Sequence, residues 1–156
     1  MIQLQRILFP TDFSELSKSA ERYACALADQ FRAELHVLHV LEDVYLFAPE
    51  PAAMVYIPPN LLIEAQQNAE QAVSRVPSSE WANGKRVVRA TRNGSPHVEI
   101  VNYANERQID LIVIGTHGRT GLTHFLLGSV AERVVQHAHC PVLTVRSEGT
   151  QFVKNG

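Results

Sequence analysis

The sequence is poor in cysteine and has almost no excess of either charge. Cys25 and Cys140 are the only cysteines among its 156 residues, and they form no CxxC pair. Two distant cysteines argue against a disulfide scaffold or a zinc ribbon, and they fit free thiols in a reducing compartment. Lysine and arginine number 14 against 16 acidic residues, a formal net charge of −2. This balance argues against a nucleic-acid partner bound by a basic patch.

Long apolar runs and targeting signals are also missing. No apolar stretch reaches the ~18 residues that cross a bilayer, and the N-terminus lacks the pattern of an export signal. These absences predict a cytoplasmic protein without a membrane partner. Hydrophobic residues nevertheless make up 46% of the chain, enough to bury one core. We expect one domain over residues 1–147 and a flexible tail over residues 148–156.

Apolar runs and amphipathic stretches alternate along the chain. The runs predict strands over residues 6–10, 34–41, 85–91, 110–115 and 141–145. The stretches predict helices over about residues 14–31, 61–76, 96–104 and 129–138. The inner face of the third is expected to consist of Val98, Val101 and Ala104, and the fourth runs through Val130, Val134, Val135 and Ala138. Residues 42–60 contain four prolines, which disfavour regular structure there.

Alternating strands and helices predict an α/β fold with a single open parallel five-stranded sheet and helices on both faces. Two of the predicted strands end in motif-like loops, Pro10-Thr11-Asp12 and Gly115-Thr116-His117-Gly118. Ligands of such sheets bind beyond the carboxyl ends of the strands, where the strand order reverses. If these two strands are neighbours at the reversal, the order is 3-2-1-4-5 and the last strand lies at an edge.

A glycine pattern follows the fourth predicted strand. Gly115-Thr116-His117-Gly118 is separated by nine residues from Gly128-Ser129, which matches neither the Walker loop nor the dinucleotide GxGxxG. Glycines let the backbone approach an anion closely and tolerate positive φ. Gly128 and Ser129 stand where a helix begins, and the free amides of a helix N-terminus favour a phosphate. The pattern therefore favours a polyphosphate site.

Positive charge beside this pattern is available from Arg119 and, less readily, from His117, because histidine is mostly neutral at pH 7. A simpler alternative remains for each part. A glycine after a buried strand is often only a turn, and Gly128-Ser129 also suits a helix start without a ligand.

These motifs resemble the universal stress protein family, and specifically its ATP-binding branch, whose pattern G-x2-G-x9-G-[ST] is matched from Gly115 to Ser129. Four further segments resemble the family in place and sequence: ILFPTDFS, LHVLHV, DLIVIGTHG and CPVLTV. The resemblance extends from about Arg6 to Arg146. It implies an adenine nucleotide alpha hydrolase-like fold, ATP with Mg²⁺ as the ligand, and a homodimer formed through the last strand.

The resemblance also implies which residues hold the nucleotide. Thr11 and Asp12 would face the adenosine, and Val40 would line the adenine pocket. The remaining wall and the triphosphate site would consist of Ile114, Gly115, His117, Gly118, Gly128, Ser129 and Val130. Two alternatives stay open, since Asp12 equally suits the cap of the first helix, and core packing alone explains Val40 and Ile114.

The remaining histidines and cysteines do not predict a metal site. His36 and His39 lie on opposite faces of one predicted strand, so they cannot bind one metal together, and we expect both to be satisfied polar groups at helix interfaces. The cluster His137, His139 and Cys140 stands alone at a helix end, where packing or capping is more common than a zinc site. Cys25 is expected to be a small core residue.

Three classes of function are compatible with these observations. No nucleophile, base and orienting group can be assembled from the motifs, so we assign no catalytic residue and expect a nucleotide-dependent stress-response regulator with slow or no ATP hydrolysis. An ATP-dependent enzyme of the adenylate-forming type is an alternative, although the SGGxDS and HIGH-type motifs are absent. The third is a protein-interaction module that uses residues 42–60, with Tyr45, Phe47 and Tyr56, and binds nucleotide incidentally. The downstream protein partner is not indicated.

Overall fold

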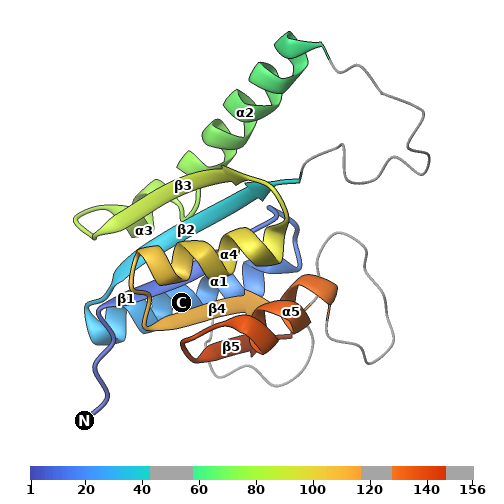
Figure 1. Ribbon diagram of the computed structural model, residues 1–156. Helices are drawn as coiled ribbons and strands as arrows, with labels where there is room; N and C mark the ends of the chain where they lie inside the picture. The colour runs from blue at the N-terminus through green and yellow to red at the C-terminus, as the bar shows by residue number, and fades with distance from the viewer. Residues whose placement is uncertain (43–57, 117–127, 147–156) are drawn as a thin grey trace.

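The computed structural model describes residues 1–42, 58–116 and 128–146 (Figure 1). The strands in this part of the chain are β1 (Arg6–Pro10), β2 (Glu34–Leu41), β3 (Val87–Asn93), β4 (Leu111–Gly115) and β5 (Val142–Val145). The helices are α1 (Ser17–Phe31), α2 (Pro59–Ser74), α3 (Ser79–Ala82), α4 (Pro96–Glu106) and α5 (Ser129–His137). The predicted tail and most of the proline-rich segment lie outside the described residues.

The strands form one parallel sheet in the order β3-β2-β1-β4-β5. The predicted order is therefore confirmed, with β3 and β5 at the two edges of the sheet (Figure 1). β1 lies at the centre, where Ile7 is opposite Leu35 in β2 and opposite Leu111 in β4. The strand order reverses between β1 and β4, which makes their carboxyl ends the expected ligand edge.

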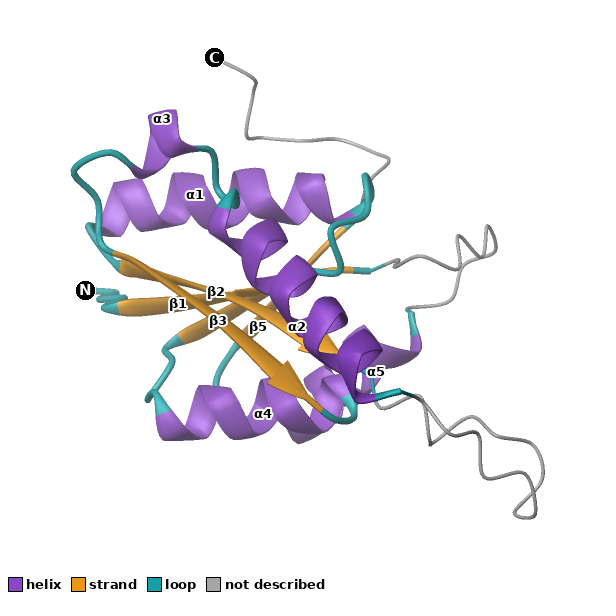
Figure 2. Cartoon of the chain, turned by 90° about the horizontal axis from the view of Figure 1, so that it is seen from above, coloured by secondary structure: helices purple, strands orange, loops and turns teal. Residues whose placement is uncertain are grey.

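Helices cover both faces of the sheet, as Figure 2 shows for α1 and α4. Successive residues of a strand point to opposite faces, so Ile7 and Phe9 pack in a cluster with residues of α1, whereas Leu8 packs with residues of α4 and α5. Both clusters consist of buried aliphatic and aromatic side chains. Strands buried on both faces explain the near-continuous apolar runs of the sequence.

The first helix starts later than the sequence predicts. A helix was expected from about Ser14, but α1 begins at Ser17. Residues 12–14 are held in a turn by side-chain hydrogen bonds, and Phe13 has a positive φ of 62°, a conformation that an α-helix cannot contain. Side chains that hydrogen-bond to nearby backbone compete with helix formation, and here they delay it.

One inner-face assignment is wrong, because Val98 in α4 is 42% exposed. The buried residues of α4 are Ile100, Tyr103 and Ala104, of which Ala104 was predicted. These three positions follow the spacing of three and four residues that places side chains on one side of a helix, and Val98 lies outside that stripe.

The connection between α2 and β3 contains a short helix that the sequence pattern did not predict. α3 begins after Ser78, whose hydroxyl accepts a hydrogen bond from the backbone amide of Trp81 at 3.4 Å. The Trp81 indole donates to Asp29 of α1 at 3.0 Å, and Lys85 lies over its ring. One turn of helix is too short to produce a periodic signal, so tertiary contacts determine it.

Candidate functional site

The sheet divides at its carboxyl edge between β1 and β4. The paired residues of these two strands are Ile7 with Leu111 and Leu8 with Ile112. Beyond them, each strand pairs outward: the Thr11 amide donates to Leu38 of β2. The Thr116 amide likewise donates to Val145 of β5, and both bonds measure 2.9 Å. Since β1 and β4 follow different neighbours at this end, the switch point is where a crevice is expected.

The loop after β1 is shaped by its own side chains. The Thr11 hydroxyl accepts a hydrogen bond from the Phe13 amide at 3.0 Å. Oδ1 of Asp12 accepts one from the Ser14 amide at 3.0 Å and another from the Ser14 hydroxyl at 2.6 Å. Two consecutive polar side chains thus each bind the backbone two residues ahead, a turn chemistry typical of threonine and aspartate.

The start of α1 is bonded to the same loop. The Ser17 amide donates to the Ser14 hydroxyl at 3.2 Å, and the Ser17 hydroxyl donates to the Ser14 carbonyl at 2.8 Å. The N-cap position belongs to Leu16, which makes no side-chain cap bond. The alternative that Asp12 is the cap of the first helix is therefore wrong, because Asp12 orders the turn that precedes the helix.

β2 contributes a residue to this region that the sequence analysis did not connect with it. His39 is buried, and its Nδ1 donates a hydrogen bond of 2.8 Å to the Thr11 carbonyl. Its ring centroid lies 4.4 Å from that of Phe13. His39 was expected at a helix interface; it lies instead against the loop after β1. Its place near the carboxyl end of β2, beside β1, is the signal that pointed there.

His36 lies on the other face of β2 and does occupy a helix interface. Its Nδ1 lies 2.9 Å from the Tyr103 hydroxyl of α4, and its Nε2 lies 2.9 Å from Glu34 Oε1. Burial lowers the pKa of His36, although the hydrogen bond with Glu34 acts in the opposite direction. The prediction that both histidines are satisfied and lie on opposite faces is confirmed.

The start of α5 lies directly at the end of β4. The Gly128 amide donates to the Thr116 carbonyl at 2.6 Å, which brings the two ends of the intervening segment together. Gly115 is a β4 residue opposite Val145, and Gly128 has a φ of −55°. Neither glycine is therefore explained by a left-handed backbone, and the Gly128 amide is not free as the sequence analysis expected.

The amides of the first turn of α5 are the backbone donors that remain at this position. The first intrahelical bond runs from the Glu132 amide to the Gly128 carbonyl at 2.9 Å. The amides of Ser129 and Val130 precede it and belong to the set that a helix leaves without an internal acceptor. Donors of this kind suit an anion.

The apolar residues assigned to the site come together in one cluster. Val40 at the end of β2, Ile114 at the end of β4 and Val130 in α5 all pack on the sheet face covered by α4 and α5. Ile114 is buried, and the other two are partly buried. This position suits a wall for an adenine ring and equally suits the edge of the core.

Three of the predicted site residues, His117, Gly118 and Arg119, lie outside the described residues. The structure brings the other predicted residues to the carboxyl edge of the sheet. Thr11 and Asp12 follow β1, Val40 lies near the end of β2, Ile114 and Gly115 end β4, and Gly128, Ser129 and Val130 begin α5.

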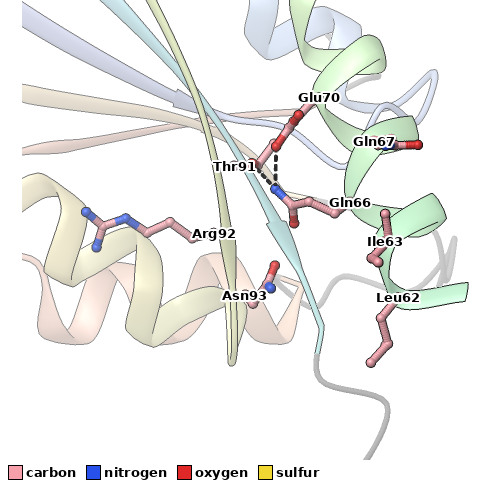
Figure 3. A pocket seen from close by; sticks show the side chains of 8 residues that line it. All are labelled: Leu62, Ile63, Gln66, Gln67, Glu70, Thr91, Arg92 and Asn93. Atoms are coloured by element: carbon pink, nitrogen blue, oxygen red, sulfur yellow. Dashed lines mark hydrogen bonds between the residues drawn. The ribbon is translucent and has the colours of Figure 1, made fainter. Parts of the chain in front are cut away.

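A separate hollow of about 520 Å³ lies between α2 and β3 (Figure 3). Its lining comprises Leu62, Ile63, Gln66, Gln67, Glu70, Thr91, Arg92 and Asn93. The Gln66 amide donates to Thr91 and to Glu70, each at 2.8 Å. Arg92 points away from α2 and pairs with Glu99 and Glu106 of α4. None of the predicted site residues lines this hollow.

Cys25 and His137 make contacts that belong to the packing and capping of the fold. Burial raises the pKa of the Cys25 thiol to about 12, so this side chain stays protonated and packs beside the core as expected. Nδ1 of His137 donates to the Arg133 carbonyl at 2.8 Å, a bond of the capping kind. Within the described ranges, no three histidine, cysteine or acidic side chains gather as a metal site.

These features define an α/β fold with a candidate anion site at the switch point of its parallel sheet. The chain belongs to the universal stress protein family, whose sequence pattern it matches over residues 3–146. No helix in the described segments has the length and hydropathy that a membrane span requires.

Individual relatives agree with this assignment. The chain is 41% identical to universal stress protein MJ0531 of Methanocaldococcus jannaschii over 91% of its length and 82% of that protein. It is 34% identical to universal stress protein YxiE of Bacillus subtilis, over 90% of this chain and 98% of the relative. Universal stress protein UspA from Lactobacillus plantarum superposes with a TM-score of 0.75 at 26% identity, covering 94% and 100% of the two chains.

Two solved structures with the same fold hold adenine nucleotides. One is a universal stress protein in complex with cAMP, with a TM-score of 0.61 and 23% identity over 94% of this chain and all of the other. The other is the universal stress protein from Archaeoglobus fulgidus in complex with dAMP, with a TM-score of 0.60 and 24% identity at the same coverage. At these identities the likeness shows the fold.

Proposed function

We propose that this protein is a nucleotide-dependent regulator of the ATP-binding branch of its family, with ATP and Mg²⁺ as the ligand. One observation carries the proposal. The outward pairing of β1 and β4 separates a loop ordered around the Asp12 carboxylate from the N-terminus of α5. A carboxylate acceptor on one side and helix amides on the other suit the hydroxyl-bearing and phosphate-bearing ends of one nucleotide.

The residues fit such a ligand in their chemistry. Thr11 and Asp12 would face the adenosine, and the cluster of Val40, Ile114 and Val130 would provide an apolar wall for the base. The amides of Ser129 and Val130, together with Gly115, Gly118, His117, Arg119 and Gly128, would hold the triphosphate. Mg²⁺ would travel with the phosphates, since it usually keeps several waters and takes few protein ligands.

The two relatives solved with cAMP and dAMP support an adenine nucleotide as the ligand class. The preference for ATP rests on the glycine pattern from Gly115 to Ser129. A triphosphate needs more amide donors than a monophosphate, and this pattern supplies two separated backbone stretches for it.

A regulatory role is favoured over catalysis because the polar side chains of the described edge are engaged in structural hydrogen bonds. The hydroxyls of Thr11, Ser14 and Ser17 are bonded to one another or to the backbone of the loop. Nδ1 of His39 donates to the Thr11 carbonyl. Among the described side chains we therefore assign no activated nucleophile, and ATP hydrolysis is proposed to be slow or absent.

The assembly proposed with this function is a homodimer through β5. This strand is an edge of the sheet and pairs with β4 on one side. An edge strand with an apolar sequence is a template for a second copy of the chain. In this proposal the nucleotide domain spans residues 1–147 and the tail 148–156 is accessory to it. The protein is proposed to act in the cytoplasm.

The test is titration calorimetry of the purified protein with ATP, AMP and GTP, each with Mg²⁺, followed by analysis of the products after prolonged incubation. Saturable binding of ATP that exceeds binding of GTP is expected, with little ADP formed. Absence of saturable ATP binding ends the proposal. Release of AMP and pyrophosphate would favour the adenylate-forming alternative, and size-exclusion chromatography with light scattering tests the dimer.

A further inference from the structure

Two histidines of β2 are both buried but have different surroundings. His36 and His39 are 3% and 8% exposed. His36 binds Tyr103 and Glu34 on the face covered by α4. His39 points to the other face, where it contacts Thr11 and Phe13 of the loop after β1. The two histidines therefore differ chiefly in the groups that their side chains contact.

Both backbone polar groups of Thr11 are bound by β2. Its amide donates to the Leu38 carbonyl at 2.9 Å, and its carbonyl accepts from His39 Nδ1 at 2.8 Å. A carbonyl oxygen only accepts, so His39 Nδ1 carries the proton. The last residue before Asp12 is thus held in position at both of its peptide bonds.

The residue after Asp12 is held by the same side chain. Phe13 has a φ of 62°, which is uncommon for a residue other than glycine. Its ring packs against the His39 imidazole, with centroids 4.4 Å apart and planes inclined by 34°. Such conformations persist only where surrounding contacts determine them. His39 therefore contacts the neighbours of Asp12 on both sides.

We propose that His39 is a positioning residue for nucleotide binding, which rests on the function proposed above. It does not contact the ligand. It fixes the peptide before Asp12 through Nδ1 and the left-handed residue after Asp12 through its ring, so that the carboxylate is ready before the nucleotide arrives. Preorganisation of this kind increases affinity because less conformational freedom is lost on binding.

Three substitutions of His39 separate the contribution of its hydrogen bond from that of its ring. His39→Phe keeps a ring against Phe13 and removes the donor. In His39→Asn the amide nitrogen takes the place of Nδ1, whereas in His39→Gln it lies further along the side chain, near the place of Nε2. His36→Phe is the matched control, since it alters another buried histidine of the same strand that does not contact the loop.

The experiment measures ATP affinity with Mg²⁺ by calorimetry and, in the protein without nucleotide, hydrogen exchange of the Phe13 and Ser14 amides. For His39→Phe and His39→Gln we expect affinity to fall about tenfold, the factor that corresponds to about 1.4 kcal/mol, and the two amides to exchange faster. His39→Asn keeps the donor but loses the ring, so its affinity should fall less, by no more than about threefold. His36→Phe should lower the melting temperature while leaving affinity and both amides unchanged.

The proposal is overturned if His39→Gln binds ATP as tightly as His39→Asn, a comparison that remains valid even where His39→Phe does not fold. It is equally overturned if His36→Phe weakens binding as much as His39→Phe, since the effect would then report general stability. Failure of the unaltered protein to bind ATP contradicts the proposed function instead. In that case the exchange of the two amides still decides whether His39 positions the loop.

Discussion

The two sides of the switch point are built by different means. On the β1 side, the side chains of Thr11, Asp12 and Ser14 bind the loop through short hydrogen bonds, and His39 contacts it from β2. On the β4 side, a backbone bond from the Gly128 amide to the Thr116 carbonyl joins the strand end to α5, beside the apolar packing of Ile114 and Val130. The loop after β1 is therefore ordered by particular polar side chains, whereas a backbone hydrogen bond joins β4 to α5.

This difference explains why the two sides look so unlike in the sequence. Side-chain turns require particular polar residues, such as the threonine and aspartate of Thr11-Asp12. Backbone amides carry no residue identity, so a site built from them is recognisable mainly by glycines and by the start of a helix. Substitutions on the two sides should have correspondingly different effects.

The largest effect is expected from Asp12→Ala. This change removes the proposed contact with the nucleotide and both hydrogen bonds from Ser14, and hydrogen bonds to a charged group are worth about 1.5–3 kcal/mol each. ATP affinity should fall by about a hundredfold, measured by calorimetry. Asp12→Asn is the control that keeps an acceptor oxygen for Ser14 and removes only the charge. Unchanged affinity in both variants would mean that the carboxylate does not face the ligand.

A smaller effect is expected from Thr11→Val, which tests the loop without touching the proposed ligand contacts of Asp12. The valine has the same shape but leaves the Phe13 amide without the acceptor it has at 3.0 Å. We expect a loss of about 1–3 kcal/mol in the free energy of unfolding, measured in urea. Ser74→Ala removes an exposed hydroxyl that binds the Gln71 carbonyl and should change stability little. Equal losses in the free energy of unfolding would show that the hydrogen bond to the Phe13 amide contributes no more to stability than the exposed bond of Ser74.

Ser129→Ala tests the β4 side of the switch point, where α5 begins. Ser129 is an exposed residue in the first turn of α5, so its hydroxyl can contribute one hydrogen bond to a phosphate while its amide remains. Affinity for ATP should weaken by roughly 1 kcal/mol, with the free energy of unfolding unchanged. A loss as large as that of Asp12→Ala would contradict the view that backbone groups dominate this side.

The smallest effect is expected in the pH dependence of stability, and it concerns His36 on the opposite face of β2. Because burial lowers the pKa of His36 in the folded protein, the unfolded chain binds more protons once the pH falls below about 6.5. The free energy of unfolding should therefore decrease as the pH falls from 7 through the lower folded pKa, and then level off. Urea titrations at several pH values should show that the free energy of unfolding depends less on pH in His36→Phe than in the unaltered protein. The difference between the two proteins isolates His36 from His97, whose pKa is also lowered by burial.

Much of the fold followed from local patterns. The strands over residues 6–10 and 34–41 were predicted to the residue, and α5 begins at Ser129, within the pair Gly128-Ser129 where a helix start was expected. Apolar runs bounded by proline, glycine or polar residues produce this accuracy, because a strand buried on both faces admits few alternatives. The strand order also followed, since only neighbouring strands at a reversal place two loops together.

The details of the candidate site did not follow in the same way. The late start of α1 arises from hydrogen bonds among Asp12, Ser14 and Ser17 that compete with the helix. The bond from the Gly128 amide to Thr116 joins residues on either side of a segment of eleven positions. Neither interaction leaves a periodic pattern in the sequence, so neither could be predicted from the spacing of apolar residues.

The amino-acid sequence alone determined the class of fold, the order of its strands and the family. Burial on both faces leaves apolar runs in the strands, burial on one face leaves a spacing of three and four residues in the long helices, and the motifs identify the family. Only the tertiary structure decided what His39 does. Its three-residue distance from His36 established that the two side chains lie on opposite faces. Which of the faces carries the loop after β1 depends on how the sheet packs. A hydrogen bond between residues 28 positions apart is a property of the folded chain, since neither residue reveals its partner locally.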